Sequence, residues 1–207
     1  MTDAGLYQRL SLDGLSRQER YKLLTGSVIP RPIALVTTLN QDGSVNAAPF
    51  SQFIIVAADP GLLGFSVGPP PKGTKPEGEK DTLRNIRRSG EFVINTVSEN
   101  LAEAVQLCAD IEESGISELQ RAGLTALPSL HVAPPRVAEC AIQFECRLEQ
   151  IIAIGDAPNH LVVGRVMQMH ARHGLIDEKY HVDSAAIAAL GRIGGRNYCR
   201  VREFIAV

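Results

Sequence analysis

The sequence predicts one mainly β domain, an antiparallel barrel with helices on its outside. Segments rich in β-branched and aromatic residues outnumber helical patterns along the chain. Most links between the expected strands are too short to contain a crossover helix, which favours antiparallel pairing. The length of 207 residues suits one domain that buries a core without disulfides or metal. We therefore expect a single domain over residues 1–207, with residues 1–15 as a peripheral segment.

Composition and charge narrow the class of protein. The chain is 44% hydrophobic and 21% charged, with a net charge of -2 and no basic face with interleaved aromatics, which argues against a general nucleic-acid binder. The N-terminus lacks the basic start and apolar core of a signal peptide, and the longest apolar region, residues 53–67, is too short to span a bilayer. The cysteines form no CxxC pair or zinc-ligand spacing, which predicts core thiols in a reduced, cytoplasmic protein: Cys108, Cys140, Cys146 and Cys199.

The first expected element is a short helix over residues 17–24. Ser16 and Glu19 have the spacing of a capping box, which marks a helix start. Gly26 can close the far end, because glycine adopts the left-handed conformation that commonly ends helices. This helix should deliver the chain to the segment around which the fold is organised.

That segment, residues 30–53, predicts a β-hairpin. The Asp42-Gly43 step between two β-rich runs is a strong signal for a tight turn. Pro49 has no N–H to donate, so the second strand should lie at a sheet edge or contain a bulge. Such places often redirect side chains toward a ligand, although an ordinary hairpin that ends in a kink explains the same residues.

Two further strands, residues 53–57 and 62–67, should precede a loop over residues 68–80 and a helix that ends at Gly90. Asp81 or Thr82 can cap this helix. Its free N–H groups, with the Lys80 ammonium and the Thr82 hydroxyl, would suit a phosphate. The alternative is a plain capped helix with a solvated lysine.

The second half of the chain continues with strands and short helices. The clearest strand covers residues 140–149, where alternation predicts one buried face. It should pair with a strand at residues 161–170 across a turn at 155–159. The other expected elements are a strand at 91–97, packing helices at 98–110 and 117–122, a helical or irregular segment at 183–190, and a final strand.

The sequence lacks the usual motifs of side-chain catalysis. No GxGxxG follows a strand, and GxxxxGK[ST] and GxSxG are absent. The only close histidines, His170 and His173, are interpreted as exposed imidazoles at a strand end rather than a metal site. No nucleophile and base stand together either. An enzyme with this sequence would therefore take its chemistry from a cofactor.

Several motifs in order and spacing closely resemble the flavin reductase-like family of FMN-binding split barrels, which includes reductase components of two-component flavin-dependent monooxygenases. The resemblance covers roughly residues 20–200 and rests on PRPIALVTT, the Asp-Gly turn, NAAPFSQF, KDTLRNI, GEFVIN, AGLT, PPRVAECAIQFEC and GRIGGRNY. It implies a split β-barrel that forms a homodimer, with one FMN per subunit in a groove at the dimer interface.

The resemblance also implies which residues contact the flavin. The phosphate and ribityl chain would be held by Arg31, Thr37, Thr38, Lys80 and Thr82. The isoalloxazine would lie against Asn46 and the bend formed by Ala48, Pro49, Phe50 and Ser51. Asp81 and Asn85 would orient this shell or bond the ribityl hydroxyls. Tyr198 would contact the flavin edge or the nicotinamide, with a core tyrosine as the alternative.

The implied activity is an NAD(P)H-dependent flavin reductase. Hydride would pass from nicotinamide C4 to flavin N5, with NADH or NADPH as a transient donor and the protein holding the two rings together. An oxygenase component is the implied partner for the reduced flavin. One alternative keeps tightly held FMN but changes the donor or oxidises an amine, and the other is an FMN-bound electron-transfer or flavin-carrier protein without NAD(P)H turnover. The fold alone does not decide between them.

Overall fold

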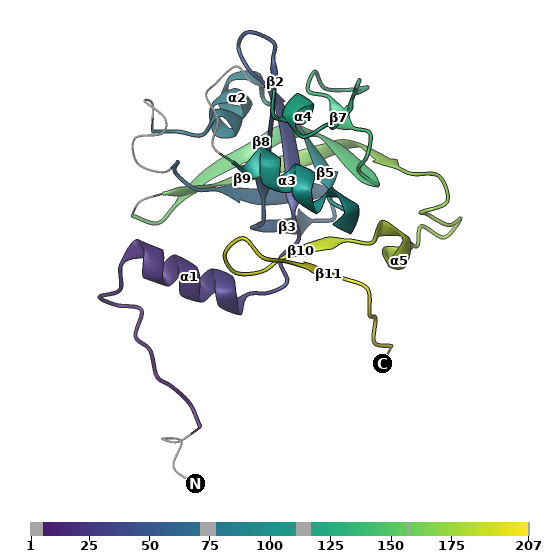
Figure 1. Cartoon of the computed structure of the whole chain (residues 1–207). Helices are drawn as coiled ribbons and strands as arrows, with labels where there is room; N and C mark the ends of the chain where they lie inside the picture. Colours follow the sequence, from purple (N-terminus) through teal and green to yellow (C-terminus); the bar gives the residue numbers. More distant parts are fainter. Residues whose placement is uncertain (1–5, 71–77, 111–116, 157, 207) are drawn as a thin grey trace.

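A seven-stranded antiparallel sheet organises the chain (Figure 1). The computed structural model describes residues 6–70, 78–110, 117–156 and 158–206. The strands of the large sheet, in chain order, are β1 (Ala34–Leu39), β2 (Val45–Phe50), β3 (Phe53–Ala57), β4 (Leu62–Val67), β5 (Glu91–Thr96), β8 (Ile142–Ile154) and β9 (Asn159–Ala171). Two small sheets pair β6 (Ala126–Leu127) with β7 (Arg136–Val137) and β10 (Leu190–Arg192) with β11 (Tyr198–Arg200).

Short helices lie around this sheet (Figure 1). They are α1 (Arg17–Ser27), α2 (Asp81–Ser89), the 3-10 turn η2 (Glu99–Leu101), α3 (Ala102–Ala109), α4 (Glu118–Arg121) and α5 (Ser184–Ile187). None of the helices in the described ranges combines the length and apolar character that crossing a membrane requires.

The order of the strands confirms the expected antiparallel barrel. The sheet runs β2-β1-β5-β8-β9-β4-β3, and every neighbouring pair is antiparallel. The long β8–β9 hairpin joins the two halves. The β1–β2 hairpin also forms as expected, with Gly43 at a φ of 83° in its turn. Because β2 is the outermost strand, Pro49 lies on a sheet edge, where its missing N–H breaks no ladder.

Alternate residues of β1 face two different cores. Ala34 and Val36 point into an aromatic core that α2 closes, where Phe65 lies between Phe50 and Phe92 with ring centroids 5.0 and 5.6 Å apart. The intervening residue, Leu35, points into the second core, which α3 and α4 cover. Since both faces of β1 are buried, this strand fixes the positions of the helices on either side.

The predicted residues for the end of α1 and for the cap of α2 are wrong. Ser16 and Glu19 do form the capping box of α1, but Gly26 lies inside the helix, which ends at Val28. In α2, Lys80 occupies the cap position and its side chain makes no capping hydrogen bond. The two expected caps are engaged elsewhere, because Asp81 pairs with Arg84 and the Thr82 hydroxyl accepts from a buried amide.

Strand β8 is longer than predicted and buried on both faces over its first half. The alternating residues Gln143 and Glu145 are 6% and 0% exposed, because the segment from 128 to 137 covers them. The Glu145 carboxylate accepts from the backbone N–H of Leu130 (2.8 Å) and His131 (2.6 Å) and lies 2.6 Å from His170 Nε2. His170 is therefore partly buried and bonded, not the exposed imidazole that the sequence indicated.

Three of the four cysteines are buried free thiols, as expected. Burial raises the pKa of Cys108, Cys140 and Cys146 to about 12, so these thiols stay protonated. Cys199 is partly exposed. The helix expected over residues 98–110 is split into η2 and α3, and its predicted packing face is confirmed by buried Leu101, Val105 and Cys108.

The Glu145 contacts predict a pH-dependent contribution to stability. Burial alone would raise the pKa of this carboxyl, but the two backbone N–H groups and His170 lower it below its ordinary value of 4.5. The stabilisation is therefore complete above about pH 4.5 and is lost as the pH falls through the lower pKa of the folded state. At pH 7, Glu145→Gln should lower the free energy of unfolding by about 2 kcal/mol.

Urea unfolding of both proteins at pH 7, 5 and 3 measures this effect. The difference between wild type and Glu145→Gln should shrink as the pH falls, because the wild-type carboxyl then binds a proton in a growing share of molecules. The matched control is Glu149→Gln, which removes an exposed carboxylate from the same strand as Glu145 and breaks its ion pair with Arg165 on β9. It should change the free energy of unfolding little at any of the three pH values. A difference that is constant across the three pH values would contradict this account.

Candidate functional site

Four buried polar side chains fix the start of α2 to the β1–β2 hairpin. Asn46 Nδ2 lies 3.0 Å from both Thr38 Oγ1 and Thr82 Oγ1, and Asn85 Nδ2 lies 3.1 Å from Thr38 Oγ1. All four residues are at most 4% exposed. The sequence named each of them as a site residue, and the structure brings them together. Their mutual hydrogen bonds hold the helix start in place beside a cavity.

Lys80 stands at this helix start in an environment that disfavours its charge. Its ammonium lies 5.5 Å from the centre of the Phe50 ring, within cation–π range. Burial lowers the pKa of Lys80. Among the residues that the structure describes, no carboxylate lies within the 4.0 Å ion-pair distance of its Nζ. A desolvated cation without an anion is costly, so an anionic ligand would stabilise the site.

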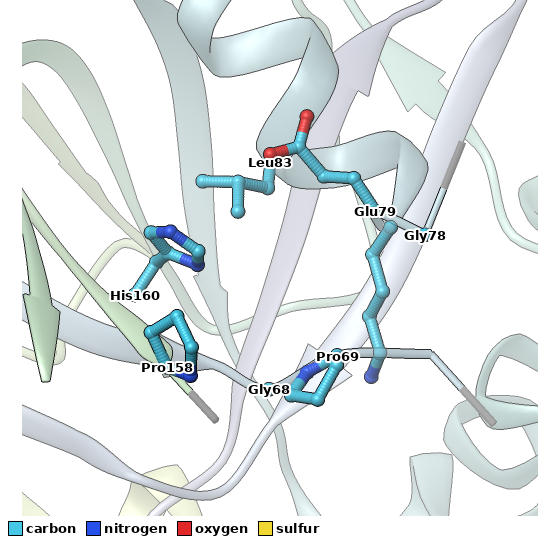
Figure 2. A pocket seen from close by; sticks show the side chains of 8 residues that line it. Gly68, Pro69, Gly78, Glu79, Leu83, Pro158 and His160 are labelled. Carbon is cyan, nitrogen blue, oxygen red and sulfur yellow. The ribbon is translucent and has the colours of Figure 1, made fainter. Parts of the chain in front are cut away.

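The cavity beside Lys80 has a volume of about 210 Å³. Figure 2 shows Pro158 and His160 along one side of it and Glu79 along the other. Its remaining lining residues are Gly68, Pro69, Gly78 and Leu83. Sequence reasoning missed His160, which opens β9 after the hairpin turn. The β4–β9 pairing brings His160 here, because it sets this residue opposite Val67, where the loop before α2 begins, and the sequence did not predict that pairing.

Arg31 lies beside Ser51, as the site prediction requires, but its other contacts connect backbone segments of this chain. We call these contacts the Arg31 clasp. The Arg31 guanidinium is 7% exposed and donates to the carbonyls of Thr25, Val28 (2.8 Å) and Ile193 (3.1 Å), and its Nε lies 3.4 Å from Ser51 Oγ. These bonds join the end of α1 to the turn after β10. Because these bonds use most of the N–H donors of Arg31, its role within this chain is to hold backbone segments together.

Thr37 lies on the opposite face of β1 from Thr38. Its hydroxyl donates to the Pro135 carbonyl at 2.5 Å, so its side chain points away from the cavity beside Lys80. Ala48 and Pro49 are partly buried on β2, opposite Val36 and Leu35 in the ladder. Their predicted contacts with a flavin ring remain predictions.

Within one chain, Tyr198 makes the contacts expected of a core tyrosine, which was the alternative to a flavin contact. It packs against the core that α3 covers, and its hydroxyl donates to Gln106 Oε1 at 3.1 Å. The Arg192 guanidinium lies 4.5 Å from the centre of its ring. Burial raises the pKa of Tyr198, so the phenol stays protonated and able to donate. Its predicted contact with a flavin edge or a nicotinamide remains a prediction.

The fold is the split barrel of flavin-dependent oxidoreductases. Residues 25–186 match the family described as "Flavin reductase like domain". The chain belongs to the flavin reductase-like family. The resemblance stated from its motifs is thereby confirmed.

Three similar proteins illustrate the range of this family. Nitrilotriacetate monooxygenase component B from Bacillus cereus is 35% identical, with a TM-score of 0.89 over 97% of this chain and 98% of that one. A 2-nitrobenzoate 2-nitroreductase, NbaA from Pseudomonas fluorescens, is 38% identical, with a TM-score of 0.84 over 97% and 95%. The uncharacterized protein BH2278 from Halalkalibacterium halodurans is 40% identical over 94% of this chain and 93% of its own length.

Proposed function

We propose that this protein is an FMN-binding, NAD(P)H-dependent flavin reductase that acts as a homodimer and supplies reduced flavin to an oxygenase component. The observation that carries the proposal is the Lys80 ammonium, which is desolvated, has no carboxylate partner in the described residues and lies beside a cavity at a helix start. A phosphate monoester would supply the missing negative charge beside the positive end of the α2 dipole. The component B from Bacillus cereus supports the oxygenase partner.

The protein's part in the reaction is to bind and orient. FMN, when bound, supplies the redox chemistry by accepting hydride from NADH or NADPH. Lys80 and the first N–H groups of α2 would hold the phosphate, and the buried cluster of Thr38, Asn46, Thr82 and Asn85 would keep that anchor rigid. The β2 bend would support the ring. A protein that binds and orients the flavin in this way needs no acid–base pair of its own. This agrees with the absence of side-chain catalytic motifs from the sequence.

Lys80→Ala tests the phosphate anchor. Loss of a charge-assisted contact should weaken FMN binding by roughly tenfold to a hundredfold. The fold should stay intact, because in the described residues Lys80 forms no ion pair and its ammonium lies over the Phe50 ring. Calorimetric titration with FMN measures the affinity. Lys179→Ala, an exposed lysine in the segment after β9, is the control and should bind FMN as wild type does. Equal affinities for Lys80→Ala and wild type would overturn the assignment.

The reductase activity is tested by recording the visible spectrum of the FMN-loaded protein without oxygen and adding NADH or NADPH separately. Rapid bleaching of the flavin band, with repeated turnover of excess FMN when air returns, is the expected result. A single reduction without turnover would favour a flavin carrier instead, and no bleaching by either nucleotide would favour another donor. Since one similar protein is a nitroreductase, 2-nitrobenzoate should be tried as an added electron acceptor.

Two features support the homodimer. The cavity of about 210 Å³ in one chain is smaller than the roughly 300–1,000 Å³ typical of sites for whole cofactors, so a second copy would complete the site. The edge strand β3 also exposes three consecutive apolar residues, Ile54 (54%), Ile55 (78%) and Val56 (41%). An apolar edge of this kind invites aggregation unless a partner covers it.

Sedimentation should therefore give about twice the chain mass of 22.4 kDa. Ile55→Asp should shift the protein toward the monomer and weaken FMN binding, because a buried carboxylate at the interface would lack a partner. Ile205→Asp, on the exposed C-terminal segment, should leave the dimer unchanged. A dimer that tolerates Ile55→Asp would place the interface elsewhere on the molecule.

A further inference from the structure

A second hollow lies at the other end of the β8–β9 hairpin from the cavity beside Lys80. It has a volume of about 430 Å³. Its lining residues come from β7, β8, β9 and the segment between β7 and β8: Arg136, Ala138, Cys140, Gln143, Met169, His170, Ala171 and Arg172. His170 stands ten residues beyond His160 on the same extended strand, a separation of roughly 30 Å. One small ligand bound to this chain cannot reach both.

Two arginines of this hollow lack the acidic partners that several other arginines of the chain have. Arg165, for example, pairs with Glu149, and both Arg200 and Arg202 pair with Glu99. In the described ranges, by contrast, no carboxylate lies within 4.0 Å of a guanidinium nitrogen of Arg136 or Arg172. Two uncompensated positive charges that share one hollow repel each other, and an anion between them would relieve that repulsion.

Two carboxylates from β8 and the segment before it, Glu139 and Glu145, bond other groups. Both oxygens of Glu139 lie 3.1 Å from the backbone N of Thr125. Glu145, which lies beneath His170, accepts from that imidazole and from two backbone N–H groups. Within the described ranges neither carboxylate forms an ion pair with Arg136 or Arg172, so no direct contact offsets the charge of the two guanidinium groups.

The walls of the hollow are held rigidly. Arg136 donates to the Pro128 carbonyl through both Nε (3.3 Å) and Nη2 (3.0 Å), and its Nη1 lies 3.4 Å from Gln143 Oε1, which leaves its remaining Nη N–H groups for a ligand. Gln143 is only 6% exposed, and its amide nitrogen donates to the carbonyls of Val137 (3.1 Å) and Cys140 (2.6 Å). Because its partners fix Arg136, this guanidinium needs little ordering to bind an anion.

We propose that this hollow binds an organic carboxylate. The two guanidinium groups match the planar, two-oxygen geometry of a carboxylate. The apolar side chains of Ala138, Cys140, Met169 and Ala171 line the same space and suit the hydrocarbon part of such a ligand. This site is separate from the proposed flavin site, and its ligand adds a function that the reductase activity does not require.

The probe is cyclohexanecarboxylate, a ring without aromatic character that cannot stack on the flavin site. Calorimetry should show saturable binding with one site per chain, at the same affinity with and without saturating FMN. The neutral amide, cyclohexanecarboxamide, should bind at least about tenfold more weakly, because it lacks the charge that the arginines recognise.

Arg172→Gln is the first variant, since Arg172 is exposed and its loss should not disturb folding. It should weaken binding of the carboxylate about tenfold or more. Arg136→Gln should do the same, with a thermal melt to confirm that the protein stays folded. Arg165→Gln removes the same charge from β9 outside the hollow and should bind as wild type does.

Methionine methyl labelling locates the bound probe. The chain has three methionines, and Met169 lines the hollow while Met167 lies two residues away on β9. The methyl signal of Met169 should shift most on titration, and Met167→Leu assigns the two signals. The proposal is overturned if there is no saturable binding, if FMN displaces the probe, if the amide binds equally well, or if Arg172→Gln and Arg165→Gln behave alike.

Discussion

The start of α2 depends on a small buried polar layer, and the candidate site depends on the start of α2. An amide and a hydroxyl enclosed between strands and a helix lose their hydrogen bonds to water, so each must find a partner in the protein. Asn46, Thr38, Thr82 and Asn85 satisfy one another across three elements. This mutual requirement sets the position of the helix, because a shift would break several bonds at once. Lys80, two residues before Thr82, is held in position by the same bonds.

The two edges of the sheet are treated differently. Strand β2 ends the sheet on one side, and there the Glu118 carboxylate accepts from the backbone N of Ala47, while α3 and α4 pack over the strand. Strand β3 ends the sheet on the other side and leaves Ile54 and Ile55 exposed. One edge of the sheet is therefore covered by helices, and the other presents apolar side chains to solvent. A neighbouring chain could pair with the sheet only at the uncovered β3 edge.

Much of the fold could be predicted because the signals are local. The Asp42-Gly43 turn, the capping box at Ser16 and the edge position of Pro49 each follow from one or two residues. The prediction of individual site residues failed where segments distant in the sequence determine their burial and hydrogen-bond partners. The alternation over residues 140–149 predicts only one buried face, but the segment that contains Leu130 and His131 folds over the other face and supplies donors to Glu145. Likewise, nothing near Thr37 in the sequence shows that Pro135 takes its hydroxyl, so the two adjacent threonines seemed equivalent although they point to opposite faces.

The Arg31 clasp also bears on how the chain folds during its synthesis. Its guanidinium bonds Ile193, which lies 162 residues further along. On the ribosome, the N-terminal helix emerges early, but the carbonyl that secures it is among the last to be made. At roughly 5–20 residues per second, the helix would wait on the order of ten seconds for its anchor. The anchor does not bury the apolar side chains at this end of the helix, because Leu24 of α1 and Val28 at its C-cap are still 52% and 61% exposed in the folded structure.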